Sequence, residues 1–155
     1  MNICLNKMTR SKMHAFFREF CYDTALSGRN SQEYAYDPVA VDQYFDHHLA
    51  TGRYHYAIEL NDKVIGDIYI KNISLESRSC EIGIHMTNDC YKGKGYGTTA
   101  LQQMLQLIKQ KTEIKEVYAR TKPDNIRCIR ILEKANFQNI SNHAQKLIYV
   151  YKIEA

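Results

Sequence analysis

A glycine-rich turn, Lys92-Gly93-Lys94-Gly95-Tyr96-Gly97-Thr98, separates a strand-like run at 80–86 from a helix-like run at 99–111. Glycines in such a turn let the main chain approach oxyanions, and the free N–H groups and dipole of the following helix favour negative charge. The turn therefore predicts a phosphate-binding loop. Its spacing matches neither a nucleotide P-loop, which ends in Gly-Lys-Ser/Thr, nor a dinucleotide fingerprint. On this stretch alone, a plain loop before a helix is an equally good interpretation.

The composition indicates an ordinary globular chain. Its 155 residues are 45% hydrophobic and 25% charged, which predicts one domain, residues 1–155, with a sizeable core. No apolar run is long enough to span a bilayer and the N-terminus lacks a signal-peptide core, so we expect a cytoplasmic protein without a membrane partner. The net charge of +4 suits an anionic ligand, but no dense basic run predicts nucleic-acid binding.

The cysteines favour a reduced, metal-free protein. They are scattered, odd in number and form no CxxC pair, so they predict neither a zinc site nor a disulfide framework. Reduced thiols fit a reducing compartment. The five positions are Cys4, Cys21, Cys80, Cys90 and Cys128.

Hydrophobic periods and turn residues predict an element order of β-α-α-β-β-β-α-β-α-β-β, a mixed α/β sheet. A helix between two strands implies a parallel crossover. The expected elements are a strand at 2–6, a helix capped by Ser11, a loop at 22–36, a helix begun by Asp37-Pro38 and ended by Gly52, strands at 54–60, 64–73 and 79–86, a helix at 99–111, a strand at 115–121, a helix opened by Pro123-Asp124, and strands at 137–140 and 146–153.

The apolar stripes of two helices predict which side chains face the core. Asn136 occupies the position of a left-handed C-cap after the last helix. The predicted inward residues are Val41, Tyr44, Phe45, His48 and Leu49 in one helix, and Ile126, Ile129, Leu132 and Ala135 in the other.

Two blocks resemble motifs of the GNAT superfamily of N-acetyltransferases. Lys92-x-x-Gly95-x-Gly97, after Glu81-Ile82-Gly83-Ile84, resembles its acyl-CoA pyrophosphate loop, and 125–137 resembles its later segment Asn-x-x-Ser-x-x-x-Leu/Tyr-Glu-Lys-x-Gly-Phe. Leu132 and the Glu-Ile-Gly-Ile strand look closest to the ribosomal-protein-alanine acetyltransferase-like branch. The resemblance implies the GNAT fold, whose central, mostly antiparallel sheet splays between strands 4 and 5.

The resemblance also implies a cofactor, acetyl-CoA, and the residues that hold it. Main-chain N–H groups in the glycine turn would bind the pyrophosphate, the pantetheine arm would extend along the strand, and a main-chain N–H of Ile84 or Met86 would polarise the thioester. Arg127 and Arg130 would reach the adenosine 3′-phosphate or stay solvated. The predicted cofactor-binding residues are Ile84, His85, Met86, Lys92, Gly93, Lys94, Gly95, Tyr96, Gly97, Thr98, Asn125 and Cys128.

Acetyl transfer to an amine needs a base, and the departing thiolate benefits from a proton. Glu81 is the first candidate for the base, because it matches the family's strand glutamate; the alternative is an exposed Glu paired with a Lys. His85 titrates near neutrality and is the second candidate, unless it only packs. Cys128 is a candidate proton donor or a packing residue, because Leu132 replaces the Tyr that many members use as general acid.

The predicted function is acetyl transfer from acetyl-CoA to a primary amine, on a protein N-terminus or a small molecule, by a monomer or homodimer. A non-catalytic acyl-CoA-binding regulatory module is the alternative, favoured by Leu132. A nucleotide enzyme or other phosphate binder fits least well, because the chain lacks a Walker ending and an acidic metal pair. In relatives, the loop that contains Tyr34 and Tyr36 helps to form the acceptor pocket, so these rings are candidates for specificity.

Overall fold

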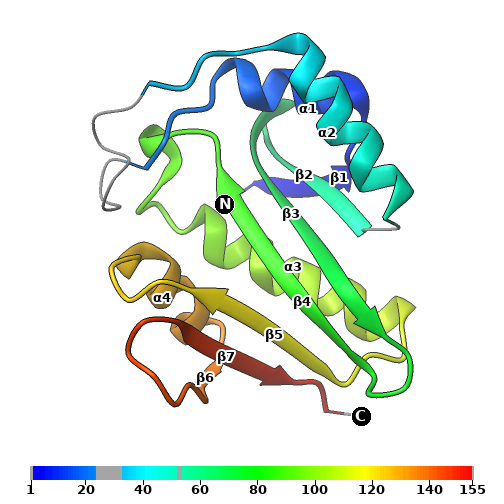
Figure 1. The fold of residues 1–155 in the computed structure, drawn as a ribbon, viewed down its shortest axis with the longest axis vertical. Coiled ribbons are helices and arrows are strands. Elements are labelled where there is room, and N and C mark those ends of the chain that lie inside the picture. Colours follow the sequence, from blue (N-terminus) through cyan, green and yellow to red (C-terminus); the bar gives the residue numbers. More distant parts are fainter. Residues whose placement is uncertain (1, 24–32, 52–53, 155) are drawn as a thin grey trace.

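The strands of the computed structural model, which describes residues 2–23, 33–51 and 54–154, form one sheet in the order β1-β2-β3-β4-β5-β7-β6. Only β4 and β5 run parallel; the other neighbouring pairs are antiparallel. The predicted element order and mixed α/β fold are confirmed (Figure 1). The elements are β1 (Ile3–Lys7), α1 (Arg10–Arg18), α2 (Pro38–Ala50), β2 (Tyr54–Leu60), β3 (Lys63–Ser74), β4 (Ser79–Met86), the 3-10 helix η1 (Asp89–Tyr91), α3 (Tyr96–Lys111), β5 (Glu116–Thr121), α4 (Ile126–Lys134), β6 (Gln138–Asn139) and β7 (Leu147–Lys152).

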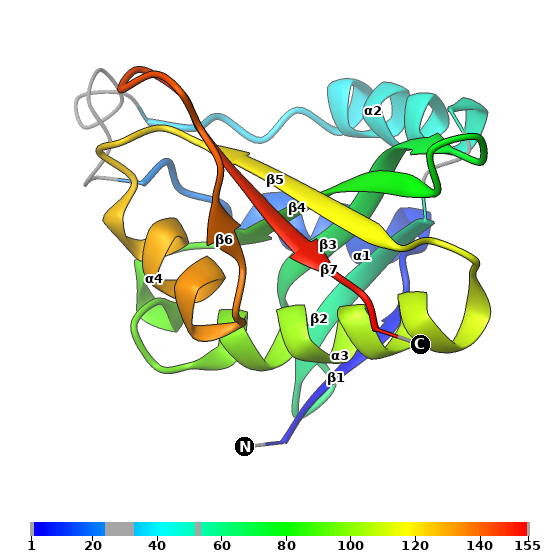
Figure 2. The ribbon, with the colours of Figure 1, turned by 90° about the horizontal axis from the view of Figure 1, so that it is seen from below.

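Helices cover both faces of the sheet, with α3 on one face and α2 on the other (Figure 2). Alternation along β2 lets one strand serve both cores, because successive side chains point to opposite faces. Ala57 and Ile58 are both fully buried, yet Ala57 packs with Met13 of α1, and Ile58 belongs to the cluster of Leu101 in α3. Within the described ranges, no helix is long and apolar enough to cross a membrane.

Strands β4 and β5 pair only where they begin. The parallel ladder joins Ser79 to Glu116, Cys80 to Val117 and Glu81 to Tyr118, and ends there. The other edge of β4 pairs with β3 from Glu81 to Met86, so β4 stays anchored while β5 diverges from it (Figure 1). The splay predicted between strands 4 and 5 is confirmed.

Helix ends account for most local differences from the predictions. Thr9, and not Ser11, caps α1, because its side chain accepts a hydrogen bond from the Lys12 N–H at 3.2 Å. Helix α3 begins three residues earlier than predicted, since Gly95 adopts a left-handed conformation with φ 86° and serves as N-cap. Helix α4 begins after Asn125 instead of at Pro123-Asp124. The predicted end at Gly52 and residues 24–32 of the predicted loop lie outside the described residues.

Two predicted inward side chains are wrong. Leu49 is 62% exposed and Ile126 is 51% exposed, because each lies in a terminal turn of its helix, where the packed stripe has ended. Asp37 caps α2 as predicted, accepting from the N–H groups of Val39 and Ala40. Asn136 has the predicted left-handed conformation, with φ 67°.

Leu132 supports a stability prediction. Its side chain is 1% exposed in the main core, whereas Leu75 in the turn after β3 is 84% exposed. Leu132→Ala should lower the free energy of unfolding by about 2–5 kcal/mol, because it leaves a cavity, and Leu75→Ala should change it by less than about 0.5 kcal/mol. Urea unfolding followed by circular dichroism measures both. Equal effects of the two substitutions would contradict the packing described.

Candidate active site

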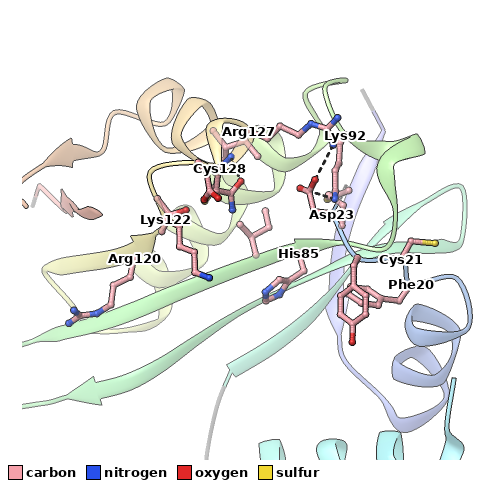
Figure 3. Close-up of a pocket in the computed structure, with 16 residues that line it drawn as sticks. Phe20, Cys21, Asp23, His85, Lys92, Arg120, Lys122, Arg127 and Cys128 are labelled. Atoms are coloured by element: carbon pink, nitrogen blue, oxygen red, sulfur yellow. Dashed lines mark hydrogen bonds and ion pairs between the residues drawn. The ribbon is translucent and has the colours of Figure 1, made fainter. Parts of the chain in front are cut away.

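A cavity of about 480 Å³ opens where β4 and β5 part (Figure 3). Four segments form its wall: the end of β4, the end of β5 with α4, the segment after α1 at 20–23, and the turn before α3 through Lys92. The cavity brings together six of the predicted cofactor-binding residues, Ile84, His85, Met86, Lys92, Asn125 and Cys128. In Figure 3, His85 lies beside Phe20 on the α1 side of β4, and Cys128 lies on the α4 side.

The glycine turn leads directly into α3. Gly93 and Gly95 have φ values of 74° and 86°, which glycine adopts without steric cost. The first bond of α3 is donated by the Thr99 N–H to the Gly95 carbonyl at 3.1 Å, and Gly95 offers no side-chain cap. The N–H groups of the first turn, at 96–98, therefore remain for a ligand at the positive end of the helix dipole.

Gly97 brings the two sequence motifs into contact. A Cβ atom at this position would lie 2.7 Å from Cδ1 of Ile131 in α4. A larger residue at 97 would therefore require the Ile131 side chain to shift, so glycine lets the first turn of α3 pack against α4 as it does here. The contact holds the N-terminal turn of α3 next to the helix that carries Asn125 and Cys128. The Asn125 side chain caps that helix by accepting from the Cys128 N–H at 3.2 Å.

Two cations and two carboxylates neutralise each other at one end of the cavity. Lys92 Nζ lies 3.1 Å from Asp23 and 3.1 Å from Asp89, and Arg127 Nη1 lies 3.1 Å from Asp89. Figure 3 shows Lys92, Asp23 and Arg127 gathered there. The predicted phosphate contact of Lys92 therefore competes with existing ion pairs, whereas Lys94 is exposed in the turn.

His85 is held by a buried carboxylate. Its Nδ1–H donates to Asp67 Oδ1 at 3.1 Å; the His85 side chain is 51% exposed and that of Asp67 is 5% exposed. Burial of the ring works to lower the pKa of His85, but the hydrogen bond and charge of Asp67 outweigh it and raise the pKa. Burial works to raise the pKa of Asp67, yet hydrogen bonds from His55 and His85 hold it well below its usual range. At neutral pH Asp67 is therefore ionised.

Glu81 is placed differently from His85. Of the described residues, sixteen line the cavity, and Glu81 is not among them. Its carboxylate accepts a hydrogen bond from Asn72 Nδ2 at 2.9 Å and lies 3.5 Å from Arg120 Nε. It sits at the last pair of the parallel ladder, opposite Tyr118, so it is held where the strands are still joined.

Cys128 lines the cavity as a neutral thiol. Burial raises its pKa, so the thiolate is scarce near pH 7. Leu132, at the family's usual tyrosine position, is 1% exposed in the core and offers no proton. Cys128 is thus a thiol near the predicted thioester position.

Sequence reasoning missed several residues of the cavity wall. Arg120 and Lys122 lie at the carboxyl end of β5, where ligands bind in open α/β sheets, and that position was the available signal. The wall segment after α1 includes the start of the predicted loop at 22–36, for which the family resemblance implied a place at the acceptor pocket; its own residues gave no local signal, because long-range folding brings them there. The missed residues are Phe20, Cys21, Tyr22, Asp23, Arg120, Thr121, Lys122, Asp124 and Ile131.

The predicted pyrophosphate ligands at 93–98, the predicted specificity residues Tyr34 and Tyr36, and Arg130 do not line the cavity. The Tyr34 ring packs edge-on against Phe20, with centroids 5.0 Å apart, so it supports a cavity residue from behind. Tyr36 bonds through its hydroxyl to His14. Arg130 is exposed on α4.

Comparisons with known proteins agree with this geometry. The family described as an acetyltransferase (GNAT) domain matches residues 2–138. A search of curated proteins finds no match.

Solved structures share the fold. An aminoglycoside acetyltransferase, AAC(6')-Ib, in complex with coenzyme A is 18% identical over 97% of this chain and 95% of its own, with a TM-score of 0.76. The ribosomal L7/L12 α-N-protein acetyltransferase RimL, also with coenzyme A, is 12% identical over 99% and 95%, with a TM-score of 0.80. Spermidine N-acetyltransferase from Vibrio cholerae, with CoA and spermine, is 15% identical over 97% and 95%, with a TM-score of 0.77.

The cysteines provide a test of the cavity geometry. Burial raises the pKa of Cys128, and burial and the charge of Glu81 raise the pKa of Cys80 to about 12, whereas Cys4 and Cys90 are exposed. Since the thiolate is the nucleophile, iodoacetamide at pH 7.5 should modify Cys4 and Cys90 first, Cys128 later and Cys80 last. Peptide mass spectrometry over a time course measures the order. Modification of Cys128 as fast as Cys4 would contradict its placement.

Proposed function

This chain belongs to the acetyltransferase (GNAT) domain family, and we propose that it is an N-acetyltransferase that moves the acetyl group of acetyl-CoA directly to a primary amine. In this proposal the protein is cytoplasmic and residues 1–155 form one catalytic domain. The observation that carries the proposal is the early end of the β4–β5 ladder beside the first turn of α3. An open strand edge next to available helix N–H groups suits a ligand with an amide-containing arm and a pyrophosphate.

Acetyl-CoA fits the described residues in two places. The N–H groups at 93–98 would hold the pyrophosphate, with Lys94 adding charge. The edge of β4 at Ile84–Met86 would accept the pantetheine arm as an added strand. The cofactor supplies an activated thioester, and a main-chain N–H of this edge would stabilise the negative charge that develops on its carbonyl oxygen. The aminoglycoside acetyltransferase and RimL structures, both in complex with coenzyme A, support this choice.

His85 is the proposed proton acceptor for the incoming amine. It lines the cavity on the α1 side of β4, whereas Glu81 does not line it and is engaged by Asn72 and by Arg120, which does. Neutral His85 is the active form. Because Asp67 raises the pKa of His85, activity should rise with pH through that raised value. Cys128, as a thiol, would supply a proton to the departing thiolate.

The acceptor is a primary amine of one of three classes. Proteins of this fold include acetyltransferases named for aminoglycosides, for spermidine and for the N-terminus of a ribosomal protein. The last class corresponds to the ribosomal-protein-alanine branch that the sequence resembles. A panel of kanamycin, spermine and an Ala-initiated peptide would separate the three.

A non-catalytic acyl-CoA-binding module is the second candidate. It is favoured by Leu132, which is buried at the position where many members carry the tyrosine that acts as general acid. Such a module would bind acetyl-CoA but release no thiol with any amine.

The proposed function first predicts an effect of the cofactor on stability. Acetyl-CoA at about 100 times its Kd should stabilise the protein by about 2.7 kcal/mol, because it binds only the folded state. Differential scanning fluorimetry measures the shift, with ATP as the control. A chromogenic disulfide then follows thiol release with the amine panel. Equal stabilisation by ATP and acetyl-CoA would contradict the proposal, and stabilisation without thiol release would support the second candidate.

The second prediction separates the two candidate bases. His85→Gln should lower kcat by about 100-fold or more, since a general base contributes about 10²–10⁴, and should leave the acetyl-CoA melting shift intact. Glu81→Gln is the matched control, expected within about 10-fold of wild type. If Glu81→Gln instead lost activity and His85→Gln kept it, Glu81 would be the base, as the sequence suggested.

A further inference from the structure

A buried carboxylate links two histidines behind the cavity. Asp67 Oδ1 lies 3.1 Å from His85 Nδ1, and Oδ2 lies 2.7 Å from His55 Nε2. The side chains of Asp67 and His55 are only 5% and 6% exposed. Neither lines the cavity, so neither touches what binds there. Of the two histidines that Asp67 binds, His85 lines the cavity and His55 does not.

Strand register places these groups on one face of the sheet. Asp67 of β3 lies opposite His85 of β4, and Tyr69 lies opposite Gly83 on one side and His55 of β2 on the other. A Cβ atom at Gly83 would lie 2.4 Å from the Tyr69 ring, so glycine makes room for that ring. Tyr69 stacks on His85, with centroids 5.9 Å apart and planes at 23°. The imidazole is thus fixed by a carboxylate at one nitrogen and by a ring along its face.

His55 bonds to the other oxygen of the same carboxylate. Its Nε2–H donates to Asp67 Oδ2, since an ionised carboxylate can only accept. His55 Nδ1 is buried, and no described residue offers it a hydrogen bond, so the hydrogen bond that orients this ring is the one to Asp67. Both oxygens of Asp67 are thus occupied, one by His55 and one by His85.

We propose that Asp67 and His55 are positioning residues for acetyl transfer: His55 fixes the Asp67 carboxylate through Oδ2, and Asp67 holds the Nδ1–H tautomer of His85, so that Nε2 accepts the proton of the amine. This inference rests on the proposed function. When the new N–C bond forms, the N–H proton of the amine passes to Nε2, the thioester C–S bond breaks, and the sulfur leaves as a thiolate that takes the proton of Cys128. Cys128 then regains a proton from solvent. Asp67 stays ionised throughout, and His85 then returns its proton to solvent.

Other charged groups also act on His85. Lys71 of β3 and Lys92 work to lower its pKa, and Arg120, Lys122 and Asp23 line the same cavity. The Tyr69 ring covers one face. None of these groups changes in the variants below, so differences between the variants report on Asp67 and His55.

The test compares two substitutions with opposite expected signs. Asp67→Asn removes the charge and should lower the His85 pKa by about 1 or more, because an adjacent opposite charge shifts a pKa by about 1–3. The acid limb of the kcat/KM profile should shift to lower pH together with this pKa, and kcat should fall about 10-fold or more. His55→Phe keeps the charge but removes its donor, so the carboxylate becomes a stronger acceptor and the acid limb should move up.

Imidazole NMR titration of His85 without acetyl-CoA measures the same shifts independently of turnover. Asp62→Asn, an exposed change of the same chemistry in the β2–β3 turn, should leave both readouts unchanged. If the wild type is active but Asp67→Asn leaves the His85 titration and the pH profile unshifted, the inference is overturned and the proposed function is not. A wild type that acetylates no amine overturns the proposed function and the inference together. If Asp67→Asn does not fold, the direction of the His55→Phe shift decides.

Discussion

The site depends on one constraint, the early end of the parallel ladder between β4 and β5. Three residue pairs hold the strands together and then the pairing stops, while β3 continues to bond the far edge of β4 as far as Met86. The opened edge is therefore rigid, because its strand is fixed from the other side. A strand that was free on both edges would lose that geometry, since its backbone N–H and C=O groups would lack the hydrogen-bond partners that keep a strand ordered. The cavity, the edge at 84–86 and the approach of α4 to α3 all follow from this arrangement.

Strand β4 uses its alternation for two purposes. The side chains that face the main core under α3 are those of Cys80, Ile82 and Met86. Their packing fixes the position of the strand relative to α3. The intervening positions, Glu81, Gly83 and His85, face the α1 and α2 side, where side chains can meet a ligand. Because each purpose uses alternate residues, the strand supports packing and chemistry without either set displacing the other. The cofactor and the amine can then meet at the strand from its two faces.

Much of the fold could be predicted from local chemistry. Asp37-Pro38 before an amphipathic run is a strong helix start, and the glycine turn became informative together with the second motif at 125–137. The Asp67–His85 contact could not be predicted, although the two strands that carry these residues, 64–73 and 79–86, were. Counting outward from the pair Ser74–Ser79 places Asp67 opposite Met86, but the register shifts between Lys71 and Ser74, near Asn72 with φ 52°. A shift of one residue moves a side chain to the other face, so an unseen bulge conceals the cluster. Wall residues such as Asp23 depend on tertiary folding and carry no local signal at all.

The buried cluster bears on whether the chain is an enzyme or a binding module. A module that only binds acetyl-CoA needs the open strand edge and the amides of α3. It gains nothing from an ionised carboxylate at 5% exposure, because removing such a charge from water costs several kcal/mol unless its partners compensate. Asp67 has those partners, and one of them, His85, lines the cavity. A buried charge whose partner is a cavity-lining imidazole is explained by proton transfer. Leu132 takes the place of only one possible proton donor, the family's tyrosine. The geometry therefore favours catalysis over binding alone.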